Sequence, residues 1–295
     1  MNYDGDGLLI DEVLEKGPFD KNHSKVKAGN IIEKIDGVEI LSDMDYYPLL
    51  NKKVGKQVLV SVYDPDTKKR WEEIVKPISK GTQNELLYQR WIKHNAEVVD
   101  SLSNGTLGYV HIRSMGDASY RDVYADILGK YNRRKGVVID TRFNGGGRLH
   151  EDIEILFSGE KYLEQVIRDS VACVMPSRRY VKPSIMIMCE ANYSNAHGTP
   201  WVYKHKKIGK LVGMPVPGTM SSVTWETLQD TDLYFGLPVV GYRTQEGYYL
   251  ENYQLEPDVK VRNTPEKLAV GVDEQLEAAV KELLKDVENY NYWGK

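Results

Sequence analysis

Residues 184–200 read SIMIMCEANYSNAHGTP, in which an apolar run gives way to polar residues. So short and apolar a run predicts a strand over Ser184–Cys189 that is buried on both faces of a sheet. A helix is expected to follow over about 195–206, so Ser194 lies at the turn from strand to helix. A serine there serves either as the N-cap of the helix or as a nucleophile exposed at the turn. The local sequence leaves both interpretations open, because the usual GxSxG context is absent.

The composition indicates an ordinary globular protein and argues against several other classes. The chain has 295 residues, of which 41% are apolar and 28% charged, and this length favours two domains over one. A net charge of −4, and the absence of a basic stretch that alternates with aromatic residues, argue against a nucleic-acid partner. No apolar run approaches the ~20 residues that a membrane span needs. Cys173 and Cys189 are too few and too far apart for a metal site, and no motif indicates a cofactor.

The chain divides into two regions with different patterns. Residues 1–80 contain short strand-like segments between turn signals, whereas residues 81–295 alternate strands with helices. In the second region strands are expected at 107–112, 136–140 and 184–189, with polar strand-like segments at 232–242 and 247–252. Helices are expected at 84–103, 120–131, 149–157, 195–206 and 264–288. Apolar strands that alternate with helices predict an α/β fold with a mainly parallel sheet that helices cover on both faces.

Three segments that carry reactive or flexible residues lie at or just past the end of a predicted strand. They are DTRFNGGG at 140–147, NYSNAH at 192–197 and LENY at 250–253. Ligands of open α/β sheets bind outside the carboxyl ends of the strands. The three segments are therefore expected to share one site.

The glycine run Gly145–Gly147 allows positive φ angles and lets backbone N–H groups approach a ligand closely. A flexible turn is the simplest interpretation. A phosphate cradle is disfavoured, because the GK[ST] of a P-loop and the spacing of GxGxxG are both missing. The other chemical use is an oxyanion hole, in which backbone N–H groups meet the charge that develops during acyl transfer.

A serine nucleophile needs a base that is itself oriented. The histidines of the chain are His23, His94, His111, His150, His197 and His205. His197 falls in the first turn of the helix after Ser194, where its side chain is expected to point along the helix rather than back at the hydroxyl. A supporting polar role suits His197 better, and none of the histidines is a convincing base.

In the first region, the motifs DGLLI at 6–10, GP at 17–18 and VKAGNIIEKIDG at 26–37 resemble a PDZ domain. Asn30 stands where these domains usually have Asp. PDZ domains bind the ends of peptide chains by adding a strand to a sheet edge. The resemblance implies a peptide-binding domain over 1–80, and the binding residues that it implies are Gly7, Leu8, Leu9 and Ile10.

In the second region, IDTRFNGGG at 139–147 and YSNAH at 193–197 resemble the oxyanion segment and nucleophile elbow of the tricorn and carboxy-terminal processing peptidases, family S41. The processing branch uses a lysine in a later turn, but GMPVPGTM at 213–220 has none. That segment and YLENYQLEPD at 249–258 are similar to the tricorn branch. The resemblance implies a crotonase-like and ClpP-like α/β protease core over 81–295. The site residues that it implies are the nucleophile Ser194, the glutamate Glu251, and an oxyanion hole of Gly146 or Gly147 with Asn195.

In the tricorn branch the catalytic histidine lies in a segment before the PDZ domain. The resemblance therefore implies the C-terminal part of a longer serine peptidase, nearly inactive by itself. Its substrates would be oligopeptides or unfolded proteins, and tricorn-like enzymes assemble into homo-oligomers. The alternative is a catalytically inactive, PDZ-containing peptide-binding or scaffold protein. The compartment stays open between cytoplasmic, periplasmic and secreted.

Overall fold

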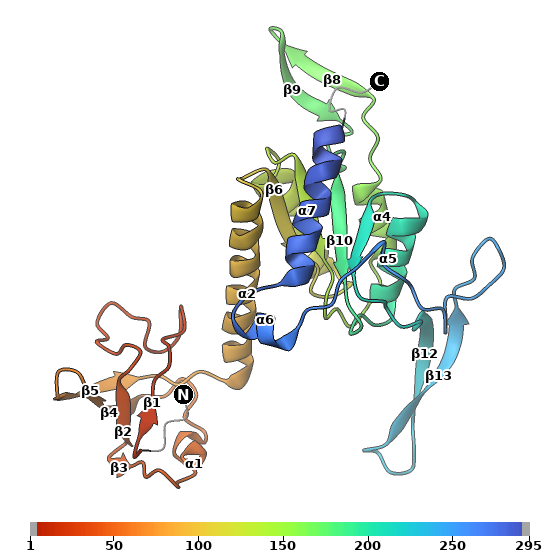
Figure 1. Ribbon diagram of the computed structural model, residues 1–295. Helices are drawn as coiled ribbons and strands as arrows, with labels where there is room; N and C mark the ends of the chain where they lie inside the picture. Colours follow the sequence, from red (N-terminus) through yellow and green to blue (C-terminus); the bar gives the residue numbers. More distant parts are fainter. Residues whose placement is uncertain (1–4, 291–295) are drawn as a thin grey trace. The chain divides into compact units, whose positions relative to one another are not determined.

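The computed structural model of the chain describes residues 5–290 and is shown in Figure 1. The chain forms two compact units, Met1–Lys93 and His94–Lys295, here unit 1 and unit 2. The border lies within helix α2, Lys80–Leu102. Across the described residues, no helix is both long and apolar enough to cross a membrane.

Unit 1 is built on an antiparallel sheet with the strand order β1-β2-β4-β5, in which β3 pairs with β2. Its elements are β1 (Leu8–Leu9), β2 (Ile31–Ile35), β3 (Val38–Glu39), α1 (Tyr47–Leu50), β4 (Val58–Asp64) and β5 (Lys69–Val75). Alternate residues of β4 are buried, because one face of the strand packs on the core of the unit. β1 lies at one edge of this sheet, between Gly7 and Ile10.

Unit 2 is built on a parallel sheet with the strand order β14-β11-β10-β7-β6. The strands of this sheet are β6 (Leu107–His111), β7 (Gly136–Asp140), β10 (Ser184–Met188), β11 (Lys210–Gly213) and β14 (Val259–Lys260). Its helices are α3 (Asp117–Ala125), the π-helical turn η1 (Asp126–Lys130), α4 (His150–Phe157), α5 (Asn195–His205), α6 (Pro265–Ala269) and α7 (Glu274–Asn289). The predicted α/β fold with a mainly parallel sheet is confirmed.

Helices cover both faces of the parallel sheet, which explains why its central strands are apolar throughout. Val137 of β7 and Met186 of β10 belong to a buried cluster that includes residues of α3, α4 and α5. On the opposite face α7 lies across β7 and β10 (Figure 1), and Gly136 faces Val287 of that helix. Every position of β7 and β10 is therefore buried, as the sequence run at 184–200 indicated.

Two hairpins extend from unit 2 (Figure 1), and the sequence patterns identified only one of their strands. The hairpins are β8 (Leu163–Ile167) with β9 (Ser170–Met175), and β12 (Ser221–Thr227) with β13 (Tyr234–Gly241). The strand expected at 232–242 is β13. The strand expected at 247–252 is wrong, because the chain turns there and Asn252 has a φ of 60°, which no strand accommodates.

The last helix expected from the sequence, over 264–288, is two helices. Gly271 lies between α6 and α7 with a φ of +83°, which stops a helix. The side chain of Asp273 then accepts a hydrogen bond from the Leu276 N–H group and caps α7. The helix expected at 120–131 begins earlier, at Asp117, and ends in the π turn η1.

Candidate active site

Ser194 lies at the sharp turn between β10 and α5. Its φ of 53° and ψ of −123° are rare for a residue with a side chain, so this turn stores strain. Ser194 occupies the N-cap position of α5, but its side chain makes no capping hydrogen bond, so of the two interpretations the side-chain cap is not observed. The positive φ is not the extended conformation from which a cap side chain reaches the first helical turn. Such a strained strand-to-helix turn is the geometry of a nucleophile elbow.

The glycine-rich segment lies directly against this turn. A Cβ built on Gly146 would lie 2.7 Å from the Cβ of Ser194 and 2.7 Å from the carbonyl oxygen of Tyr193. A Cβ built on Gly147 would lie 2.2 Å from the carbonyl oxygen of Met115. Both glycines also have positive φ angles, of 96° and 137°. Glycine is thus required at position 146 for the segment to approach the serine, and at position 147 for it to approach the backbone of Met115.

The three residues expected at the oxyanion hole differ in whether their backbone N–H groups are already hydrogen-bonded. The Gly146 N–H group donates to Asn144 Oδ1 at 2.8 Å. The N–H groups of Gly147 and Asn195 donate no hydrogen bond within the described part of the chain. The N–H groups of Gly147 and Asn195 are therefore not engaged within the described residues, whereas that of Gly146 is engaged with Asn144.

A buried ion pair fixes the strand end from which the glycine segment begins. Asp140, the last residue of β7, is fully buried and accepts from Arg142 Nη2 at 2.7 Å and from the Tyr109 hydroxyl at 2.9 Å. Arg142 Nη1 also lies 2.8 Å from Asp273 Oδ2, at the start of α7. Burial alone would raise the pKa of Asp140, but the charge and hydrogen bonds of Arg142 outweigh burial and lower it. The charged pair therefore anchors this loop to α7.

The side chain of Asn195 joins the elbow to the far end of the glycine segment. Its Oδ1 accepts from the Leu149 N–H at 2.8 Å and from the His150 N–H at 3.1 Å, and its Nδ2 lies 2.7 Å from His150 Nδ1. The N–H group of Tyr193 donates to the carbonyl oxygen of Asn144 at 3.0 Å. The two loops are thus held together by side-chain and backbone hydrogen bonds. Both polar atoms of the Asn195 side chain take part in them.

Glu251 is tied to the same site through the segment that follows β11. The Ser194 N–H group donates to Thr219 Oγ1 at 3.1 Å, and the Asn252 N–H group donates to the Gly218 carbonyl oxygen at 2.9 Å. Adjacent residues of one segment therefore hold the elbow and the turn that carries Glu251. The Oε2 atom of Glu251 is buried and has no hydrogen-bond partner among the described residues.

No hydrogen bond joins a histidine of residues 94–290 to the Ser194 hydroxyl. His197 is fully buried, and both its ring nitrogens lack a hydrogen-bond partner within that same stretch. His150 is bonded to the Asn195 amide, and His111 Nε2 lies 3.0 Å from a backbone carbonyl oxygen. The structure thus brings together Ser194, both glycines, the Asn195 N–H and the turn of Glu251. It places Leu8 and Leu9 in unit 1, on β1.

Sequence reasoning missed several residues that hold the site together. Asp140 and Arg142 carried a signal, because two opposite charges directly at the end of a buried strand are expected to pair. Thr219 carried none, since its bond to Ser194 joins positions that no local pattern connects. Asn144 lies within the quoted glycine segment, but its role in binding the Gly146 N–H depends on the loop conformation.

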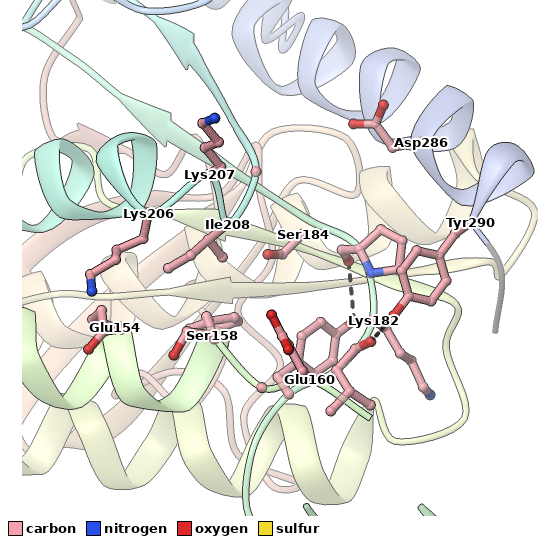
Figure 2. Close-up of a pocket in the computed structure, with 16 residues that line it drawn as sticks. Glu154, Ser158, Glu160, Lys182, Ser184, Lys206, Lys207, Ile208, Asp286 and Tyr290 are labelled. Carbon is pink, nitrogen blue, oxygen red and sulfur yellow. Dashed lines mark hydrogen bonds between the residues drawn. The ribbon is translucent and has the colours of Figure 1, made fainter. Parts of the chain in front are cut away.

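A cavity of about 520 Å³ lies elsewhere in unit 2 (Figure 2). It is lined by Ser184, the first residue of β10, and by Lys206 and Lys207, which follow α5. Ser194 follows the opposite, carboxyl end of β10, so this cavity does not belong to the candidate site. Among the described residues, no group of three or more His, Cys, Asp and Glu side chains is placed to hold a metal ion.

The sequence and the fold of the chain are similar to those of known peptidases. Residues 106–261 match peptidase family S41. The chain is 27% identical over 288 residues to the tricorn protease of Thermoplasma volcanium, which covers 94% of this chain and 26% of that protein. It is 25% identical over 283 residues to a tricorn protease homolog of Saccharolobus solfataricus, covering 92% of this chain and 25% of the homolog. Its fold is similar to a crystal structure of the tricorn protease, with a TM-score of 0.79 and 23% identity over 97% of this chain and 28% of that one.

These matches identify the family of the chain, and they also show that the chain corresponds to only part of its relatives. The chain spans about a quarter of the length of the tricorn relatives. The family match at 106–261 covers more than half of the 295 residues and includes Ser194, Glu251 and both glycines. The resemblance inferred from the sequence is thereby confirmed for the second region, and the chain belongs to peptidase family S41.

Proposed function

We propose that the chain carries the nucleophile, the oxyanion donors and the glutamate of a tricorn-like serine peptidase that hydrolyses peptide bonds in oligopeptides or unfolded proteins. The observation that carries this proposal is the strained turn of Ser194 packed against Gly146. A residue that only capped a helix would need neither the strain nor the glycine. Membership of a peptidase family supports the same chemistry.

The reaction proposed for this geometry is acyl transfer. Ser194 Oγ attacks the carbonyl carbon of the scissile peptide bond while a base takes the hydroxyl proton, and the N–H groups of Gly147 and Asn195 donate to the oxyanion. The C–N bond then breaks, the amine leaves with that proton, and the acyl group stays on Ser194 as an ester. Water attacks the ester, which releases the carboxylic acid product and restores the hydroxyl.

The base is assigned to a histidine other than His111, His150 and His197. His111 and His150 are engaged elsewhere, and His197 is buried without a bond to the Ser194 hydroxyl. The carboxylate of Glu251 would help to orient the incoming imidazole, as the carboxylate of a catalytic triad does. Without that base, acylation of Ser194 is expected to be slower by about 10⁶-fold.

Residues 1–80 are assigned to a PDZ-like domain and residues 81–295 to the protease domain. The support for a peptide-binding role is the position of β1, an edge strand that carries Leu8 and Leu9. An extended peptide adds to such an edge by main-chain hydrogen bonds. Gly7 and Ile10, which flank β1, complete the proposed binding edge.

A homo-oligomer is part of the same proposal. Ile167, Trp225 and Tyr234 of the two hairpins are 64%, 63% and 66% exposed. Apolar surface of this kind is typical of association sites. Light scattering over a concentration series should show a species larger than one chain, and a monomer at every concentration would contradict this part.

Burst kinetics with an activated ester of an acylated amino acid test the central proposal. With imidazole as an external base, the chain should release roughly one equivalent of alcohol quickly as the acyl-enzyme accumulates, and without imidazole this release should be much slower. Ser194→Ala should show no burst. Ser222→Ala removes an exposed serine of β12 and should keep it.

Two outcomes would overturn the proposal. One is a burst that survives Ser194→Ala, which would locate the nucleophile elsewhere. The other is a wild-type chain that shows no burst at any imidazole concentration while unit 1 still binds peptides. That result would favour the alternative, a catalytically inactive peptide-binding or scaffold protein.

A further inference from the structure

Buried polar atoms without a hydrogen-bond partner are concentrated on two residues of the site. Among the described residues these atoms are Asn30 Nδ2, His197 Nδ1, His197 Nε2, Thr244 Oγ1 and Glu251 Oε2. Three of these five atoms belong to His197 and Glu251. A buried polar group without a partner costs free energy, so each one needs a physical reason.

The two residues are attached to the same segment of the chain. His197 lies in the first turn of α5, and a Cβ built on its neighbour Gly198 would lie 2.4 Å from Met220 Cε. The turn that carries Glu251 is bonded to Gly218, two residues before that methionine. The start of α5 and the glutamate turn therefore pack on one short stretch, 218–220.

The charge of Glu251 reaches the imidazole ring. Burial lowers the pKa of His197, and the negative charge of Glu251 partly offsets that effect, as does the backbone of Tyr253, which lies near the ring but outside hydrogen-bond geometry. A lowered pKa keeps the ring neutral near neutral pH. A neutral imidazole has one N–H donor, so it can satisfy a carboxylate oxygen without cancelling its charge.

We propose that His197 and Glu251 form a buried imidazole–carboxylate pair, in which a ring N–H group donates to Oε2 through one water molecule and orients the carboxylate toward the catalytic base. His197 is thus a positioning residue that acts through Glu251. The catalytic consequence rests on the function proposed for Ser194, whereas the pair itself does not.

Two other roles for His197 are less consistent with the structure. A general base must reach the proton that it removes, but the His197 ring nitrogens make no hydrogen bond to the serine or to any described residue. A residue that only fills the core would be apolar, since an unpaired imidazole at 0% exposure is costly. Pairing with Glu251 removes two of these costs together.

Nuclear magnetic resonance of the ring nitrogens tests the pair without using activity. Long-range ¹H–¹⁵N spectra report the tautomer and pKa of His197, assigned through the loss of its signals in His197→Gln. Glu251→Gln is nearly isosteric and should lower the His197 pKa further and shift both ring nitrogens. Glu256→Gln is the matched control, because Glu256 is exposed and bonds Gln254 and Lys260 instead. Ring shifts and a pKa unchanged by Glu251→Gln would overturn the pair.

The acylation burst tests the positioning role. His197→Leu and Glu251→Gln should each slow the burst about tenfold, and the double variant should be no slower than either single one. His197→Gln keeps an N–H donor and should recover most of the rate. Multiplicative effects of the two substitutions would refute positioning through Glu251. A wild-type chain without a burst would refute the proposed function and leave the spectra to decide the pair.

Discussion

The two halves of the candidate site differ in how completely their polar groups are paired. Around Ser194, the amides of Asn144 and Asn195 and the hydroxyl of Thr219 all make hydrogen bonds that fix the elbow and the glycine segment. Around Glu251, the carboxylate and the His197 ring contain buried atoms without a partner among the described residues.

In the proposed mechanism, the half around Ser194, here called the acylating half, is already held in place by hydrogen bonds within the described residues. Donors that are already aimed at the oxyanion cost no reorganisation during the reaction. The half around Glu251, here called the glutamate half, has buried polar atoms without a partner among the described residues, and in the proposed mechanism these atoms orient the catalytic base. Substitutions around Ser194 should therefore disturb the structure of the elbow and the glycine segment. Substitutions around Glu251 should leave that structure intact and disturb the orientation of the catalytic base.

The largest effect is expected where the acylating half is anchored. Arg142→Met leaves the carboxylate of Asp140 buried and unpaired, and should lower the free energy of unfolding by about 3–5 kcal/mol. Urea denaturation measures this loss. The control Arg121→Met removes an exposed pair with Asp117 and should cost at most about 1 kcal/mol. Equal losses in the two variants would show that the buried pair is not an anchor.

The next effect distinguishes two neighbouring glycines. Gly146→Ala places a methyl group 2.7 Å from the Ser194 Cβ at a positive φ, and should slow the acylation burst by about 10²-fold or more. Gly145→Ala adds the same group where nothing lies within 4 Å, and should stay near the wild-type rate. Similar rates for both variants would mean that the segment does not need to approach the serine.

A smaller effect is expected at the segment that links the two halves. Thr219→Val keeps the shape of the side chain but removes the acceptor of the Ser194 N–H, a loss of about 1 kcal/mol and hence roughly fivefold in burst rate. Thr219→Ser retains the hydroxyl and should restore the rate. Were Thr219→Val as fast as wild type, the elbow would be held without this link.

The smallest effect concerns acid stability. Burial lowers the pKa of His197 below its ordinary value of 6.5, so the unfolded chain takes up a proton there before the folded chain does. Stability should consequently fall as the pH drops below 6.5. His197→Gln has no such proton to gain, and should lose less stability than the wild type between pH 7 and pH 5 in urea titrations. A steeper loss of stability with falling pH in His197→Gln than in the wild type would show that folding does not lower the pKa of His197.

Much of this architecture could be predicted from local patterns. The apolar run at Ser184–Cys189 defines a central strand, and the motifs around Gly146 and Ser194 identify the loops that meet at its end. The hairpins were largely missed, since β8, β9 and β12 lack the pattern of a buried strand. The bond from Ser194 to Thr219 depends on tertiary packing, which no short window of sequence contains.

We propose that Ser194 is a nucleophile and that its oxyanion donors, the N–H groups of Gly147 and Asn195, are already in place. Peptide mass spectrometry after treatment with a fluorophosphonate tests it most directly. We expect one adduct on the peptide that contains Ser194, formed faster with added imidazole and absent from Ser194→Ala. An adduct on another residue, or no adduct on Ser194 at any imidazole concentration, would contradict the account.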